Sequence, residues 1–103
     1  MLSAAFAMPT IAPAADSPVP TIQVEITRFA FAPREITVAP GDRIIWTNRD
    51  EAPHTVTSDD RSFASKGLDT GDSFEHTFSG EGDFRYICAV HPFMTGMVHV
   101  RKR

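Results

Sequence analysis

The sequence predicts an all-β fold, an antiparallel Greek-key β-sandwich of seven to eight short strands. Several short segments alternate apolar and polar residues with the two-residue period of a strand. Turn signals such as Pro40-Gly41-Asp42 separate these segments, and no stretch of the chain shows helical periodicity. Short strands at frequent intervals, with turns between them and no helix, are typical of two sheets packed face to face.

The N-terminal half supplies four expected strands and one irregular segment. The strands are residues 21–27, 35–39, 43–48 and 54–57. In the first three, apolar residues occupy alternate positions and therefore share one face of the strand. Between the first two strands, Phe29 and Phe31 lie in a turn or bulge, and we expect both rings to fill the core. Pro53, whose ring fixes the backbone, leads into the short fourth strand at His54.

The C-terminal half begins with a polar, turn-rich connection and continues with three expected strands. These are residues 73–78, 83–88 and 95–100. Two phenylalanines and His76 fall on one face of the first of them. Because Cys88 ends the second, we expect His91 and Met94 on the loop that precedes the closing strand.

The composition is that of one small globular domain. The 103 residues are 42% hydrophobic and 22% charged, which argues against a disordered chain. A formal charge of −3, without a basic stripe that contains aromatic residues, argues against nucleic acid as a partner. No run of the roughly 18 apolar residues that a membrane span needs is present. We therefore expect a monomeric domain without a membrane span.

The first fifteen residues have the character of a leader. They carry no charged side chain, are rich in alanine and end in Ala12-Pro13-Ala14-Ala15, the small-residue pattern of a secretory cleavage site. A complete signal peptide begins with a positive region, and none is present, so we interpret residues 1–15 as a truncated or mis-started signal. The alternative is a disordered N-terminal tail. Export would deliver the mature domain, residues 16–103, to the periplasm.

The stretch with the most chemistry holds Cys88, His91 and Met94, three sulfur or imidazole side chains within seven residues. A lone cysteine can be buried core, a catalytic nucleophile, a redox sensor or a metal ligand. A cysteine, two histidines and a weak axial methionine form a blue-copper electron-transfer site, and His54 is the candidate for the second histidine. The competing interpretation, a core cysteine with coincidental neighbours, is weakened by the strand-end position of Cys88 and by Pro53 beside His54.

Other candidate ligands fit less well. Met97 is the one rival to Met94 as an axial ligand, but it lies beyond Gly96 within the closing strand and is expected to point away from the metal. His76 and His99 are interpreted as surface or core histidines, since the ligand set is already complete without them.

The segment Tyr86-x-Cys88-x-x-His91-Pro-Phe-Met94-x-Gly96 closely resembles the C-terminal ligand loop of the amicyanins, small members of the cupredoxin family. The resemblance extends upstream to the Pro-Gly-Asp turn, Trp46-x-Asn48 and Ala52-x-His54. It implies one type 1 copper ion per chain, with His54, Cys88 and His91 as trigonal ligands and Met94 as the axial one. It also implies that Asn48 hydrogen-bonds near the cysteine sulfur and ties the two ligand loops together.

The function predicted from this site is the transport of single electrons by Cu(II)/Cu(I) cycling, not catalysis. An apolar ring of Ala52, Pro53, Pro92 and Phe93 around His91 is the expected surface for brief docking with redox partners. The resemblance suggests a quinoprotein amine dehydrogenase as donor and a c-type cytochrome as acceptor. One alternative is a copper carrier or storage protein without an electron-transfer role. The other is a fragment of a copper oxidase or nitrite reductase, for which four histidines supply too few ligands.

Overall fold

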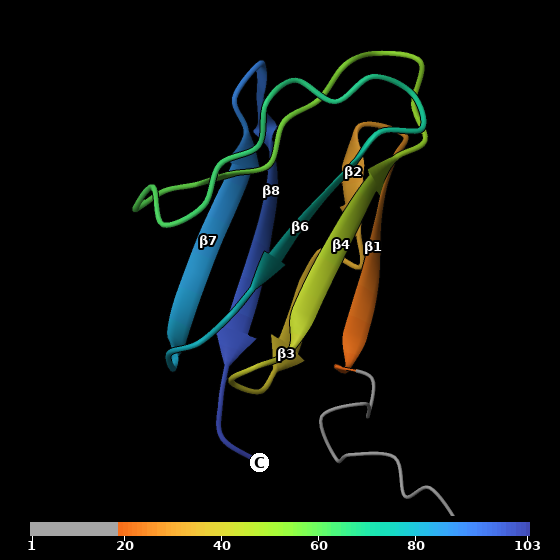
Figure 1. Ribbon diagram of the computed structural model, residues 1–103. Coiled ribbons are helices and arrows are strands. Elements are labelled where there is room, and N and C mark those ends of the chain that lie inside the picture. The colour runs from red at the N-terminus through yellow and green to blue at the C-terminus, as the bar shows by residue number, and fades with distance from the viewer. Residues whose placement is uncertain (1–18) are drawn as a thin grey trace, which may run out of the picture.

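A computed structural model describes residues 19–103, which form two four-stranded sheets packed face to face (Figure 1). The strands are β1 (Thr21–Thr27), β2 (Ala30–Ala32), β3 (Glu35–Val38), β4 (Arg43–Asn48), β5 (Thr57–Ser58), β6 (Ser73–Thr77), β7 (Gly82–Cys88) and β8 (His91–Val100). The predicted all-β sandwich is therefore confirmed. The leader predicted at residues 1–15 lies outside the described residues. Among those described, no helix is long and apolar enough to cross a membrane.

The sheets are mixed, whereas the sequence suggested antiparallel ones. One sheet has the order β2-β1-β4-β6 and the other β3-β8-β7-β5. β1 pairs in parallel with β4, and β3 with β8, while the other pairings are antiparallel. The chain crosses to the second sheet for β3 and then returns, so β4 runs beside β1 in the same direction. Alternation along a strand identifies its buried face but not its neighbour, which explains the difference.

The core lies between the sheets and is built from the apolar faces that alternation predicts. Trp46 on β4 is fully buried, and its ring lies 5.5 Å from that of Tyr86 on β7. Phe63 and Leu68 anchor the long connection between β5 and β6, and both side chains are buried. This packing holds β4 against β7 across the core, and β7 ends at Cys88, where the candidate site lies.

Phe29 is not a core residue, contrary to the prediction, although Phe31 is. The side chain of Phe31 is 2% exposed, whereas that of Phe29 is 43% exposed. Arg28 and Phe29 both adopt positive φ angles, of 54° and 56°, in the turn between β1 and β2. This left-handed turn directs the Phe29 ring outward, toward the end of the sandwich that carries Cys88.

Two strand boundaries differ from the predicted ones and affect the site. β8 begins at His91, so His91 and Met94 lie on the first part of a strand and not on a loop. The short strand expected at residues 54–57 is reduced to β5, and His54 instead forms an isolated bridge with Leu68. Both changes give the candidate ligands firmer backbone support than loops would provide.

A charged cluster lies on the outer face of the β3–β8–β7 sheet, around His99. The His99 ring contacts Asp83 on β7 at 2.6 Å and Glu35 on β3 at 2.5 Å, and Arg101 contacts Asp83 at 2.6 Å. Hydrogen bonds to Glu35 and Asp83 raise the pKa of His99 above its ordinary value of 6.5. Hydrogen bonds from His99 and Arg101 lower the pKa of Asp83 below 3.8.

We therefore expect His99→Gln to remove a pH-dependent part of the stability. A histidine whose pKa rises on folding stabilises the fold fully below 6.5, and this contribution is lost as pH rises through the folded-state pKa. Because the pKa of Asp83 is lowered on folding, Asp83 stabilises the fold above pH 3.8. This contribution is lost as pH falls through its folded-state pKa. The difference in Tm between the wild type and His99→Gln should thus shrink from about pH 6 to about pH 9. An equal difference at both pH values would contradict this account.

Candidate metal centre

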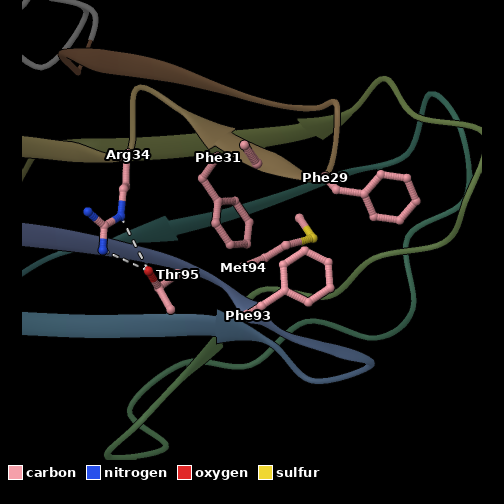
Figure 2. Close-up of a pocket in the computed structure, with 7 residues that line it drawn as sticks. Phe29, Phe31, Arg34, Phe93, Met94 and Thr95 are labelled. Atoms are coloured by element: carbon pink, nitrogen blue, oxygen red, sulfur yellow. Dashed lines mark hydrogen bonds between the residues drawn. The ribbon is translucent and has the colours of Figure 1, made fainter.

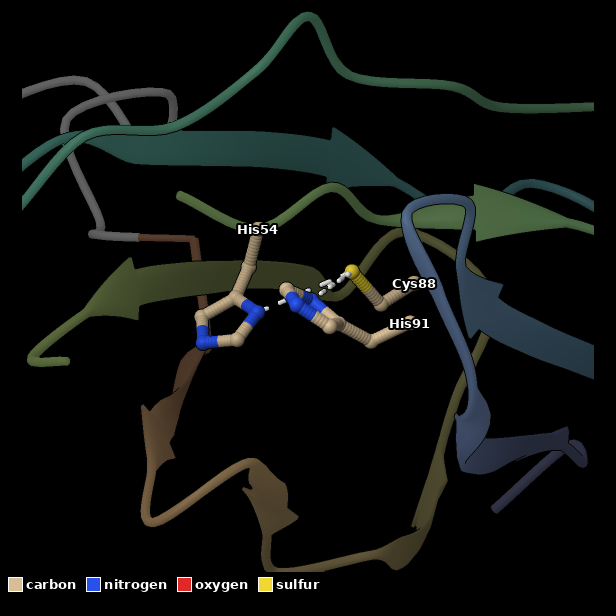
Figure 3. A group of neighbouring side chains, drawn as sticks. All are labelled: His54, Cys88 and His91. Carbon is tan, nitrogen blue, oxygen red and sulfur yellow. Dashed lines mark hydrogen bonds between the residues drawn. The ribbon is translucent and has the colours of Figure 1, made fainter. Parts of the chain in front are cut away.

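Three potential ligands from two distant parts of the chain converge at one end of the sandwich (Figure 3). His54 follows β4, Cys88 ends β7 and His91 begins β8. Their donor atoms all lie within 4.8 Å of one another. The Cys88 Sγ atom is 3.7 Å from Nδ1 of His54 and 3.6 Å from Nδ1 of His91. His54 and Cys88 are fully buried, and His91 is partly exposed.

Local backbone structure explains why these side chains meet. A register shift between Ile87 and Cys88 pairs Cys88 with His91 across the tight β7–β8 connection. Such a bulge redirects side chains at the end of a strand. His54 is held by two backbone hydrogen bonds with Leu68, one in each direction, at 3.1 and 2.7 Å. Both ligand segments are thereby held by backbone pairing.

The donor set and its spacing fit a copper ion. On the scale of first-row metal bonds known for zinc, about 2.0 Å to nitrogen and 2.3 Å to sulfur, two donors held 120° apart lie about 3.7 Å from each other. The two sulfur–nitrogen distances of 3.7 and 3.6 Å match this separation. A soft thiolate together with two imidazoles of intermediate softness is a donor set that suits copper.

The sulfur of Cys88 receives a backbone hydrogen bond whose donor residue the sequence did not identify. The Thr55 N–H donates to Cys88 Sγ at 3.3 Å, and the Ala89 N–H donates to the Thr55 hydroxyl at 2.7 Å. Thr55 therefore joins the segment of His54 to the segment of Cys88. A hydrogen bond to the sulfur stabilises negative charge on it, which suits a thiolate ligand.

Asn48 has a different role from the one the resemblance implied. Its Nδ2 atom donates to the carbonyls of Ala52 at 2.9 Å and Leu68 at 2.8 Å, and its Oδ1 atom accepts the Asp50 N–H at 2.9 Å. Asn48 is fully buried and braces the segment that carries His54. The bond to the sulfur comes from the Thr55 amide, and the Thr55 hydroxyl adds a second link to the Cys88 segment by accepting from the Ala89 N–H.

Asp50 is a second residue that sequence analysis missed. Its Oδ2 atom lies 2.8 Å from Nε2 of His54, the ring nitrogen opposite the one that faces Cys88. Burial raises the pKa of Asp50, but hydrogen bonds from the Phe29 amide, the His54 ring and the Arg28 amide outweigh this and hold the pKa below 3.8. The carboxylate four positions before His54 is the signal that could have identified it.

Met94 lies on β8, three residues after His91, and faces inward. Its side chain is 2% exposed. Met94 and Phe31 line a surface pocket of about 230 Å³, with Phe29 and Phe93 on one side and Arg34, hydrogen-bonded to Thr95, on the other (Figure 2). Met97 falls on the opposite face of β8, because side chains alternate along a strand.

Exposed apolar residues lie close to the partly exposed His91: the Phe29 and Phe93 rings are 5.1 and 6.0 Å from its ring, and Val90 and Pro92 flank it in the chain. We define the rim as Phe29, Pro53, Val90, Pro92 and Phe93, all of which are exposed. Phe93, Val90 and Phe29 are 71%, 59% and 43% exposed and account for most of the exposed large apolar side chains in the described part of the chain. Of the patch expected from the sequence, Ala52 is half-buried and the others are exposed.

Comparisons with known proteins agree with the fold and the donor set. The family model described as a cupredoxin-like domain matches residues 1–100. The chain is 29% identical to amicyanin from Paracoccus versutus, over 84% of this chain and 70% of that protein. It is 27% identical to amicyanin-alpha from Methylorubrum extorquens, over 95% and 87% of the two chains. A solved structure of a purple cupredoxin from Nitrosopumilus maritimus superposes with a TM-score of 0.73 at 33% identity, covering 78% of this chain and 99% of the other.

Family and donor set together confirm the predicted cofactor, one copper ion in the single ligand group found among residues 19–103. The chain therefore belongs to the cupredoxin-like family, and its resemblance to the amicyanins is confirmed.

Proposed function

We propose that this chain is a type 1 copper protein that carries single electrons between redox partners. His54, Cys88 and His91 would be the equatorial ligands and Met94 the axial one. The observation that carries the proposal is the convergence of the three buried or half-buried donors within 4.8 Å, directly beneath the apolar rim. When bound, copper supplies a one-electron couple between Cu(II) and Cu(I).

The chain contributes a preformed and dry ligand site. His54 and Cys88 are fully buried, so water has little access to their donor atoms. The Thr55 amide stabilises negative charge on the sulfur at 3.3 Å, which tunes the potential of the bound metal. Because the ligands are held by backbone pairing, they have little freedom to move when the charge of the site changes, and this keeps the reorganisation small.

Electrons would enter and leave through His91. It is the ligand whose edge reaches the surface, and the rim around it offers an apolar contact suited to brief docking. We propose transient redox proteins as partners, with a quinoprotein amine dehydrogenase and a c-type cytochrome as the specific pair, and the periplasm as the location. The remaining histidines support a carrier over an enzyme, since His76 stacks on Phe63 at 4.9 Å and His99 is bonded to Glu35 and Asp83.

Addition of copper to the purified chain tests the proposal. An intense visible absorption at one copper per chain is expected, because a thiolate bound to Cu(II) gives a strong charge-transfer band. A colourless protein that binds only Cu(I) would contradict electron transfer and favour the alternative of a copper carrier or storage protein.

Met94 and Met97 offer a matched test of the axial ligand. Met94→Leu should shift the reduction potential of the copper-loaded protein and change its visible spectrum, since the axial ligand tunes both. Met97→Leu removes the same thioether from the outer face of β8 and should change neither. Equal effects of the two substitutions, measured by potentiometric titration, would remove Met94 from the ligand set.

A further inference from the structure

We infer that Asp50 is a positioning residue whose single carboxylate fixes both the ligand His54 and the rim residue Phe29. The inference rests on the proposed function, because it treats His54 as a ligand and the rim as a docking surface. It assigns Asp50 a task that neither the cupredoxin-like fold nor the ligand spacing requires: the mechanical coupling of a buried ligand to the surface that a partner touches.

The first half of the coupling is the contact with His54. Asp50 Oδ2 lies 2.8 Å from Nε2 of His54, whose ring is fully buried. The carboxylate can only accept a hydrogen bond at this contact, so Nε2 must carry the proton. Nδ1 then keeps its lone pair, and Nδ1 is the atom that faces Cys88 at 3.7 Å. Asp50 thereby selects the tautomer of His54 that can bind a metal.

The second half is the turn between β1 and β2. The Arg28 amide donates to Asp50 Oδ1 at 2.7 Å, and the Phe29 amide donates to Asp50 Oδ2 at 2.9 Å. Both donor residues have positive φ, a conformation that residues with a side chain adopt only when the surroundings support it. Asp50 lies more than twenty positions away in the sequence and is the support that the structure provides for both amides.

The turn sets the position of the Phe29 ring against the site. The ring is perpendicular to His54 and to His91, at centroid distances of 5.2 and 5.1 Å, and it is stacked with Phe93 at 6.5 Å. Phe29 thus covers the gap between the two histidine ligands and remains 43% exposed to a partner. The Asp50 carboxylate therefore contacts both the ring of the ligand His54 and the turn that positions the Phe29 ring.

The test uses nitrogen and proton NMR of the metal-free protein at mildly alkaline pH. In the wild type, His54 should carry its proton on Nε2, and the Arg28 and Phe29 amides should resonate downfield and exchange slowly. Asp50→Ala should give mixed tautomers of His54, faster amide exchange at both positions and loss of the contacts between the Phe29 and His91 rings. Copper(I) affinity, measured by competition with a chelator, should fall about 10- to 100-fold.

Three further variants separate the two halves. Glu51→Gln removes one charge from the same loop and should leave every signal unchanged. Phe29→Leu should remove the ring contacts and keep the His54 tautomer. Asp50→Asn keeps the shape, but either orientation of its amide sets an NH₂ group against the Arg28 or the Phe29 amide, so at least one of these amides should exchange faster.

Several results would overturn the inference. A proton on Nδ1 of His54 in the wild type would do so without any variant, even where Asp50→Ala fails to fold. The inference would also be overturned if the Arg28 and Phe29 amides of Asp50→Asn exchanged as slowly as in the wild type. The same holds if Glu51→Gln showed the changes expected of Asp50→Ala. These signals come from metal-free protein, so their failure leaves the copper proposal standing. A colourless copper-loaded wild-type protein would instead contradict the proposed function.

Discussion

Cys88→Ala is expected to abolish the visible absorption of the copper-loaded protein and to leave the fold intact. Cys88 is the chain's one cysteine, and its sulfur is the donor that faces both His54 and His91. Without a thiolate there is no sulfur-to-copper charge transfer, and the remaining imidazoles hold copper far more weakly. Loss of one buried sulfur should lower the free energy of unfolding by only about 1–2 kcal/mol. Visible absorption, copper content and urea unfolding measure the three quantities.

His99→Gln is the control for this experiment. It removes a histidine whose two ring nitrogens are already paired with Glu35 and Asp83. Its copper-loaded form should keep the full absorption. A strong visible band that survives in Cys88→Ala would mean that the sulfur of Cys88 is not a copper ligand.

Gly96→Ala is expected to destabilise the sandwich strongly. Gly96 on β8 pairs with Tyr86 on β7, and the Tyr86 ring lies across it. A Cβ atom at Gly96 would come 2.2 Å from Cζ of that ring, well inside van der Waals contact. Tyr86 is fully buried against Trp46 and Phe31, at centroid distances of 5.5 and 4.7 Å, so the ring has no free space to enter. We expect a loss of about 3 kcal/mol or more in the free energy of unfolding.

Gly67→Ala is the matched control for this prediction. A Cβ atom there meets nothing within 4 Å, and Gly67 has no positive φ. Urea unfolding should show Gly67→Ala within about 1 kcal/mol of the wild type. Equal unfolding midpoints for the two variants would show that the Tyr86 ring yields to the added methyl group and that the close packing on Gly96 is not required.

The sequence predicted the strands well because alternation is a local property. Strands β1 and β4 have the predicted bounds, and the inward residues of the predicted strands are buried or half-buried. The parallel pairing of β1 with β4 could not be predicted, since it depends on β3 joining the other sheet. The outward direction of the Phe29 ring could not be predicted either, because the positive φ of Phe29 depends on the distant carboxylate of Asp50.

The same distinction holds at the candidate site. The sequence named His54, Cys88 and His91, and the structure brings their donor atoms within 4.8 Å, because strand ends and short spacings identify residues that meet at one end of a sandwich. The supporting hydrogen bonds were harder to predict. Thr55 reaches Cys88 across 33 positions through a backbone amide, which every residue type except proline carries. The resemblance to the amicyanins implied that bond for Asn48, and Asn48 braces the His54 segment instead.

The most direct test of the central claim is a reductive titration of the copper-loaded wild-type chain, followed by its visible absorption. We predict that one electron per chain bleaches the band completely, that oxidation restores it fully, and that repeated cycles leave copper bound at one ion per chain. Reduction that releases the copper, or a band that does not return on oxidation, would contradict the account of this chain as an electron carrier.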